Sequence, residues 1–299
     1  MSKGSISSHY VPRLILRKFS DKLCLYNVKT GELQENIVPE HAYVIDDLYD
    51  RETEKKLNEK IESQFGNLLS NVILKADKEI SLTRHQLLMI KKFLLVSILR
   101  TMQNEKLLQR EKQLHKMFDI PFEEKQIDGE TPFDYWMRTL NVILDTDGTP
   151  QSILEHPNNT YPAYRWSQVV NGAYVAFWDS PEKTDEFVIT DIGMTSENEK
   201  GWDGIRTHND KKLNWLKQLL DSSTNEIARV IYSTCDFSEN YMMFPISSKR
   251  MIVLICPFYK YRYVCKNAGV KVPDLEYLTV IPNESLFEPN GNKYVLPQL

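Results

Sequence analysis

Residues 87–99 read LLMIKKFLLVSIL, which is the most apolar stretch of this chain. A helix drawn through it is apolar on nearly every side, so we expect it at the centre of a core rather than on a surface. The stretch is 13 residues long and is interrupted by Lys91 and Lys92, which makes it too short to span a bilayer. It therefore predicts a buried helix around which the rest of the fold is arranged.

Segments on either side of this stretch extend the helical region. A first helix is expected to begin near Glu52. Its apolar residues recur at helical spacing: Leu57, Ile61, Phe65, Leu68, Leu69 and Val72. The central helix has Ser81 or Thr83 as its N-cap and is expected to continue to Met102 and beyond. A third helix is expected from Pro132 to Leu144.

Strand signals precede and follow the helices. Segment 23–33 predicts a β-hairpin whose turn lies at 29–31, where a glycine follows two polar residues. Segment 42–45 predicts a further short strand. In the second half of the chain, 173–178 and 186–190 predict two paired strands joined by a polar turn.

A helix at 211–227 and a short buried strand at 251–255 are expected further along the chain. Together the elements predict an α+β protein with an N-terminal β-hairpin, a central helical bundle around one buried helix, and a β-rich C-terminal half. Proline and asparagine cluster at 156–159, the best linker candidate. We therefore expect lobes 1–150 and 151–299 within one integrated domain.

Composition excludes several classes of protein. The 299 residues carry a net charge of −4, which argues against a wholly basic nucleic-acid coat and against an acidic disordered tail. No two of the 11 glycines are spaced G-x-G, so the dinucleotide fingerprint is absent. The four cysteines lack zinc-ligand spacing, and no secretory signal is recognised. We expect a cytoplasmic protein with reduced thiols and no membrane association.

Two basic segments stand out against this acidic total. Residues 82–118 hold eight Lys or Arg against two Glu, a net charge of +6, and residues 3–29 hold six against one Asp, a net charge of +5. Such segments indicate a local positive face for a polyanionic partner. The alternative is that these cations lie on ordinary solvated helix surfaces.

The sharpest motif is His9-Tyr10-Val11-Pro12-Arg13, followed by Leu16-Arg17 and Phe19. It resembles the opening signature of a bacterial family with a domain of unknown function. The resemblance covers roughly residues 9 to 258 and includes four later matches: Glu62, Arg100-Thr101, Thr190-Asp191 and Pro245-Ile246-Ser247. The chain departs from the family at the strand that ends T-S-D-N-P, where this sequence reads Ile189-Thr190-Asp191-Ile192.

The resemblance implies a role in anti-phage defence, because members of this family resemble components of prokaryotic defence islands. It implies no mechanism. A phage-encoded trigger is a partner consistent with that setting.

The matched residues suggest a chemistry if the fold gathers them. His9 can act as a general acid or base near neutral pH, with Glu62 and Asp191 orienting it or binding a divalent ion such as Mg²⁺. Three arginines can grip phosphate through their planar fork: Arg13, Arg17 and Arg100. The alternative is an interior ion-pair network in which Arg100, emerging from a buried helix, takes Glu62 as its carboxylate.

Two function classes follow from these observations. The first is a defence effector enzyme, a nuclease that cuts RNA or DNA. The second is a non-catalytic module that recognises a phage protein or a nucleotide through the same polar residues. Weaker candidates are the nuclease-like string Glu54-Lys55-Lys56 and the alternating tyrosines and cations of 259–263, which resemble a base-stacking strand, as does the similar segment 161–166.

Overall fold

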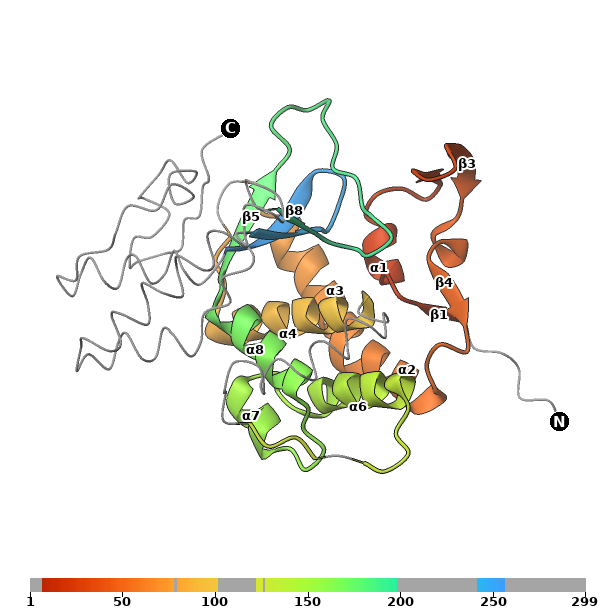
Figure 1. Ribbon diagram of the computed structural model, residues 1–299. Helices are drawn as coiled ribbons and strands as arrows, with labels where there is room; N and C mark the ends of the chain where they lie inside the picture. The colour runs from red at the N-terminus through yellow and green to blue at the C-terminus, as the bar shows by residue number, and fades with distance from the viewer. Residues whose placement is uncertain (1–6, 78–79, 102–121, 126, 198–240, 256–299) are drawn as a thin grey trace, which may run out of the picture.

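The computed structural model (Figure 1) describes residues 7–77, 80–101, 122–125, 127–197 and 241–255. The expected helix at 211–227, the segment 259–263 and the extension beyond Met102 lie outside these residues. The described elements confirm an α+β fold of helices and small antiparallel sheets. None of the described helices is long and apolar enough to cross a membrane.

The helix expected near Glu52 is a chain of four helical segments. It begins with α2 (Arg51–Lys56), continues as the π-helical η2 (Leu57–Glu62) and α3 (Ser63–Leu68), and ends with the π-helical η3 (Leu69–Ile73). Asp50 caps it, because its carboxylate accepts a hydrogen bond from the Thr53 amide N at 2.7 Å. The apolar stripe is buried as predicted, and Phe65 stacks on Phe93 with ring centroids 3.7 Å apart.

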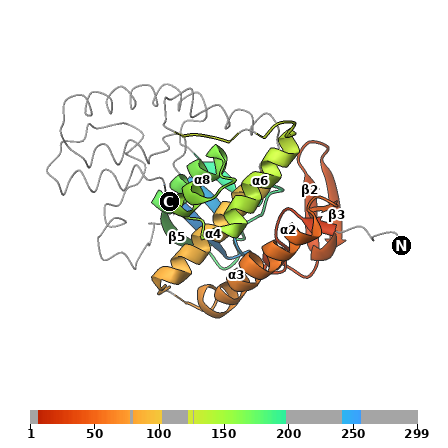
Figure 2. The ribbon, with the colours of Figure 1, turned by 90° about the horizontal axis from the view of Figure 1, so that it is seen from below.

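The predicted buried helix is α4 (Arg84–Thr101). Thr83 and Gln86 cap it reciprocally: the Gln86 amide N donates to Thr83 Oγ1 at 3.2 Å, and the Thr83 amide N donates to Gln86 Oε1 at 2.9 Å. Leu94, Leu95 and Leu99 are wholly buried. Figure 2 shows α4 running between α3 and α6 (Pro132–Asp145), with α8 (Tyr161–Gly172) beside it, so its central position is confirmed.

Helix α6 confirms the helix expected from Pro132, and Thr131 and Asp134 form its capping box. The polar cluster at 156–159 is the short loop between α7 (Pro150–Glu155) and α8. The strand-like reading of 161–166 is wrong, because these residues form the first half of α8. Thr160 caps that helix, and a proline in the first turn suits a helix start.

A four-stranded antiparallel sheet covers the helices, in the order β5-β8-β7-β6. Its strands are β5 (Tyr174–Asp179), β6 (Thr195–Glu197), β7 (Tyr241–Pro245) and β8 (Arg250–Ile255). The strand at 251–255 is confirmed, but the pairing of 173–178 with 186–190 is wrong. β5 pairs along its whole length with the buried β8, while 186–190 is an extended, largely exposed segment that forms no strand.

The N-terminal part adds two small sheets and a second core. Strand β1 (Ser7–His9) pairs with β4 (Val44–Asp46), and β2 (Leu23–Asn27) pairs with β3 (Glu32–Ile37), which confirms the predicted hairpin. Two short helices, α1 (Arg13–Leu16) and the 3-10 helix η1 (Pro39–His41), lie between the strands. The second core consists of Val11, Leu16, Leu23 and Ala42. The loop after β5, drawn in green in Figure 1, crosses to α1 and packs Ile189 against this core.

Candidate functional site

Arg100, at the end of α4, joins the N-terminal motif to the helix that carries Glu62. Its side chain is buried, and Nη1 donates to Oε1 of Glu62 at 2.6 Å. Nη2 donates to the backbone carbonyl of His9. The ring of Tyr49 lies beside the guanidinium, with 5.6 Å between its centroid and Cζ. The ion pair between Arg100 and Glu62, which the sequence suggested as the alternative to a catalytic role, is therefore present. Arg100 also positions the backbone of the His9 motif.

His9 itself is half-buried. Burial lowers the pKa of its imidazole, and the nearby charges of Arg13 and Arg100 lower it further, while Glu62 and a backbone hydrogen bond to Pro39 oppose the shift. Nε2 lies 3.3 Å from the carbonyl oxygen of Pro39. Because a carbonyl only accepts, we assign the ring proton to Nε2, which leaves Nδ1 as the acceptor. At neutral pH the ring is therefore a neutral base.

Glu54 belongs to the same cluster, although the sequence singled it out only within a nuclease-like string. Burial raises the pKa of its carboxyl, the charge of Arg100 opposes that shift, and the charge of Glu62 adds to it. Ser8, wholly buried on β1, also lies within reach of this carboxyl. The spacing of eight residues between Glu54 and Glu62, about two helical turns, was a signal that both share one face.

Asp191 lies on a different side of the motif. It is exposed, and its negative charge acts on the hydroxyls of Tyr10 and Tyr43. Both tyrosine pKa values are raised, with burial as the larger cause and Asp191 as the second. The predicted site residues thus fall into two groups: His9, Glu62 and Arg100 come together, and Asp191 joins two tyrosines that the sequence did not assign to the site.

Of the two remaining arginines, Arg13 begins α1 and Arg17 directly follows it, and both are exposed. Arg17 forms an ion pair with Glu40, and the hydrogen bond between them lowers the pKa of that carboxyl. The positive charge of Arg13 lowers the pKa of the His9 imidazole. These arginines are placed where a ligand in solvent can reach them, in contrast to Arg100.

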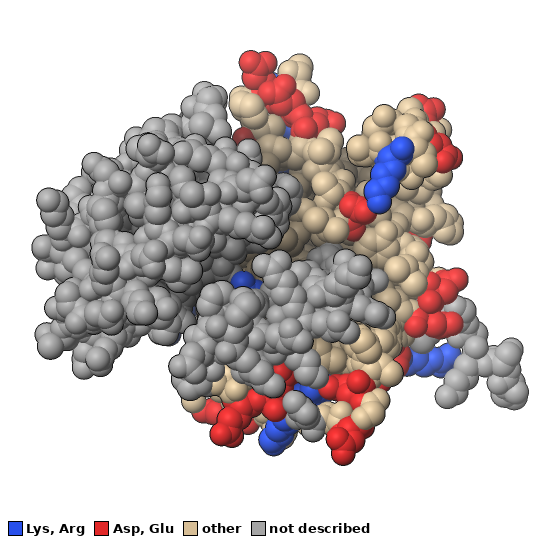
Figure 3. Space-filling view, in the orientation of Figure 1, with Lys and Arg blue, Asp and Glu red and all other residues tan. Residues whose placement is uncertain are grey.

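The basic segment 82–118 does not form an exposed positive face where it is described. Lys91 is buried, and its Nζ donates to the carbonyls of Asn171 at 2.6 Å and Ala173 at 2.9 Å, at the end of α8. Lys92 donates to the Thr146 carbonyl at the end of α6. Cations at helix C-termini are favourable. On the face of the molecule that Figure 3 draws, the Lys and Arg side chains of the described residues are scattered and form no continuous patch.

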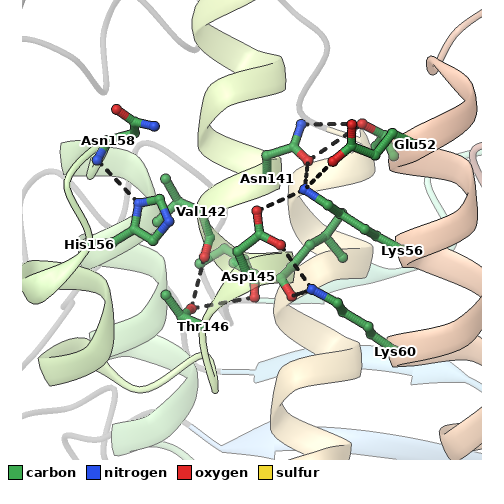
Figure 4. Close-up of polar contacts among 12 residues, drawn as sticks. Glu52, Lys56, Lys60, Asn141, Val142, Asp145, Thr146, His156 and Asn158 are labelled. Atoms are coloured by element: carbon green, nitrogen blue, oxygen red, sulfur yellow. Dashed lines mark hydrogen bonds and ion pairs between the residues drawn. The ribbon is translucent and has the colours of Figure 1, made fainter.

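A second polar cluster lies between α2, η2 and the end of α6 (Figure 4). Lys56 and Lys60 donate to the two carboxylate oxygens of Asp145 at 2.8 and 2.9 Å, and Asn141 accepts from Lys56 at 3.3 Å. These groups satisfy one another and close the C-terminus of α6, so we assign them a structural role.

Metal ligands were part of the sequence-based expectation. Within the ranges that the structure describes, no group of three or more His, Cys, Asp and Glu side chains is arranged to hold a metal ion. Glu62 is engaged with Arg100, and Asp191 lies with the tyrosines. The groups gathered at the motif are His9, Glu54 and Glu62 around the buried guanidinium of Arg100.

Comparison with known proteins identifies a family. A family model described as "Protein of unknown function (DUF4238)" matches residues 8–277, which is most of the chain. The chain belongs to this family. No curated protein and no solved structure matches the chain.

Proposed function

We propose that this member of the DUF4238 family is an anti-phage defence effector of prokaryotes, a nuclease that cleaves phosphodiester bonds in RNA or DNA. The defence setting is inferred from the resemblance carried by the N-terminal motif. The chemistry is inferred from one observation. The charges of Arg13, Glu62 and Arg100 all act on the half-buried imidazole of His9, and the buried Arg100 is ion-paired with Glu62.

In this proposal His9 moves the proton. Its Nδ1 accepts a proton from the attacking hydroxyl or water, and the imidazolium then returns a proton to the departing oxygen. Glu62 favours the imidazolium electrostatically, since its charge raises the pKa of His9. Arg100 acts as a positioning residue, because its guanidinium binds Glu62 and the His9 carbonyl at once.

The exposed arginines take the phosphate. The charge of the exposed Arg13 acts on the imidazole, and a phosphate can displace the solvent-exposed carboxylate of Glu40 from Arg17. Bidentate contacts of this kind hold the scissile group near Nδ1 of His9. A nucleic acid would therefore be bound from the side of α1.

The test uses the full chain, in cells challenged with phage and as purified protein with end-labelled RNA and DNA. His9→Asn keeps a donor and an acceptor but removes proton transfer near neutral pH. We expect it to remain folded and to lose protection and cleavage, with a rate about 10²–10⁴-fold lower. The matched control is His156→Asn, in the loop between α7 and α8, where Nδ1 accepts from the Asn158 amide N (Figure 4).

The second candidate is a binding module, and the engagement of the buried Arg100 with Glu62 favours it, because both charges are already paired within the fold. In that case the His9 surface recognises a phage protein or a nucleotide without chemistry. A folded His9→Asn protein that protects cells as well as the wild type would establish this candidate in place of the nuclease.

A further inference from the structure

Tyr10 and Tyr43 form an aromatic pair at the open end of the β1–β4 sheet. Their ring centroids are 5.8 Å apart with an interplanar angle of 69°, and the Tyr10 amide N donates to the Tyr43 carbonyl at 3.2 Å. Both residues are half-buried rather than enclosed in the core. Tyr10 directly follows His9 in sequence.

The backbone at Tyr43 is unusual for an aromatic residue. Its φ is +56°, in the left-handed region that glycine and asparagine adopt more readily. Holding a bulky side chain there costs free energy that the surrounding structure must offset, and such residues cluster at ligand sites. The position of this ring is thus maintained against a local conformational preference.

Asp191 is brought to the pair by the loop that follows β5. Ile189 packs against the N-terminal core together with Tyr10 and Tyr43, and Gly193 lies against Val11, where an added Cβ would be 3.7 Å from both Val11 Cγ atoms. These two contacts fix the loop on either side of Asp191, which is exposed and whose charge acts on both tyrosine hydroxyls. The arrangement therefore combines two aromatic rings, a carboxylate and, at the start of α1 and directly after it, two arginines.

This combination matches the chemistry of a guanine nucleotide. A nucleobase stacks on an aromatic ring, and a carboxylate accepts two hydrogen bonds at once. Guanine presents two adjacent N–H donors, on N1 and on the exocyclic amino group, whereas adenine, cytosine and uracil each present fewer donors beside one another. The ribose phosphate of such a nucleotide can pair with Arg13 or Arg17, which are exposed and lie three and seven residues after Tyr10.

We propose that Tyr10, Tyr43 and Asp191 form a base-binding site selective for guanine, in single-stranded nucleic acid or in a free nucleotide. This proposal rests on the proposed function in one respect only: if the protein is a nuclease, guanine is a base of its substrate. The site stands on its own geometry and can exist in a binding module as well as in a nuclease. A polymer and a mononucleotide share the recognised chemistry, and the experiment separates them.

The test measures binding of GMP, AMP, CMP and UMP, and of short G-containing and G-free single-stranded RNA, to the full chain by calorimetry. We expect GMP to bind at least about tenfold more tightly than the other mononucleotides. Asp191→Asn should remove most of that preference, since loss of a bidentate contact costs about tenfold to a hundredfold. Asp185→Asn, an exposed change on the same loop, is the matched control.

Two tyrosine variants separate stacking from folding. Tyr43→Leu should weaken all four nucleotides alike, and Tyr43→Phe, which keeps the ring, should bind as the wild type does. Equal affinity for all four nucleotides, preference for another base, no binding at millimolar concentration, or an unchanged preference in Asp191→Asn would each overturn the site. Tighter binding of G-containing RNA than of GMP identifies the polymer as the ligand, and the reverse identifies the free nucleotide.

The outcomes also separate this inference from the proposed nuclease. His9→Asn should keep the preference for GMP over the other mononucleotides, because the imidazole is not part of the base site. Guanine selectivity lost in Asp191→Asn without any His9-dependent cleavage would leave the site standing and reject the nuclease. Cleavage that depends on His9 but is indifferent to Asp191→Asn and to guanine would reject the site alone.

Discussion

Nη1 of Arg100 lies 2.6 Å from Oε1 of Glu62, although 38 positions separate the two residues. Through its other terminal nitrogen the same guanidinium holds the carbonyl of His9. One buried side chain thus ties the start of the motif, the π-helical turn at Glu62 and the end of the core helix α4 together.

The first prediction concerns this pair. Glu62→Ala leaves a buried guanidinium without its carboxylate, and we expect a loss of about 3–5 kcal/mol in the free energy of unfolding. The melting temperature should fall by at least about 5 °C. Glu59→Ala is the control, because Glu59 is exposed and pairs only loosely with Lys55, at 4.0 Å. A Glu62→Ala melt within a degree or two of wild type contradicts the pairing.

The second prediction is the pH dependence that His9 confers. Its pKa in the fold lies below the unfolded value of 6.5, so the unfolded chain binds more protons between the two values. The stability due to His9 is thus fully present above about pH 6.5 and is lost as the pH falls through the folded pKa. The melting temperatures at pH 5 and pH 7 should differ more for the wild type than for His9→Asn. Equal differences in the two proteins would argue against a lowered pKa of His9.

The third prediction concerns Lys91, the buried cation on α4 that donates to carbonyls at the end of α8. Lys91→Met keeps the aliphatic stem but abolishes the hydrogen bonds to the carbonyls of Asn171 and Ala173. We expect a loss of roughly 1.5–3 kcal/mol, the range for hydrogen bonds to charged groups, measured by urea unfolding. Arg84→Met, at the exposed first position of α4, should change stability by less than about 0.5 kcal/mol.

The fourth prediction concerns Arg250, which joins the sheet to the helices. Its Nη2 donates to Asp179 at 2.8 Å on β5, and its Nη1 donates to the Ala76 carbonyl at 2.9 Å beyond η3. Arg250→Ala should cost at least about 1.5–3 kcal/mol. The control change Lys55→Ala, at a side chain that is 69% exposed and 4.0 Å from Glu59, should be nearly neutral. Similar melting temperatures for both variants would show that Arg250 does not join the layers.

Much of the fold was predictable because its signals are local. The hairpin turn at 29–31, the cap at Thr83 and the apolar run of α4 each act within a few residues, and each is found where expected. The prediction for segment 161–166 was wrong, although its signals are also local. Its aromatic residues suggested a strand, while the cap at Thr160 indicated the helix.

The partner of β5 was not a local property. Segment 186–190 is close in sequence and apolar enough to pair with it, but β8 pairs instead, from more than 70 positions away. Ile252 and Val253 of β8 are wholly buried, so the central place in the sheet goes to the strand that removes more apolar surface from water. Only the packed sheet decides that competition.

The sequence by itself determined that a buried helix organises this protein, and that an arginine leaving such a helix requires a carboxylate. Tertiary structure alone decided that the charge of Arg100 acts on Glu54 as well as on Glu62, that the charge of Asp191 acts on Tyr10 and Tyr43, and that Lys91 turns inward. The physical reason is the range of the forces involved. Helix periodicity and turn geometry are set by neighbouring residues, whereas burial and charge pairing depend on segments that only the folded chain brings together.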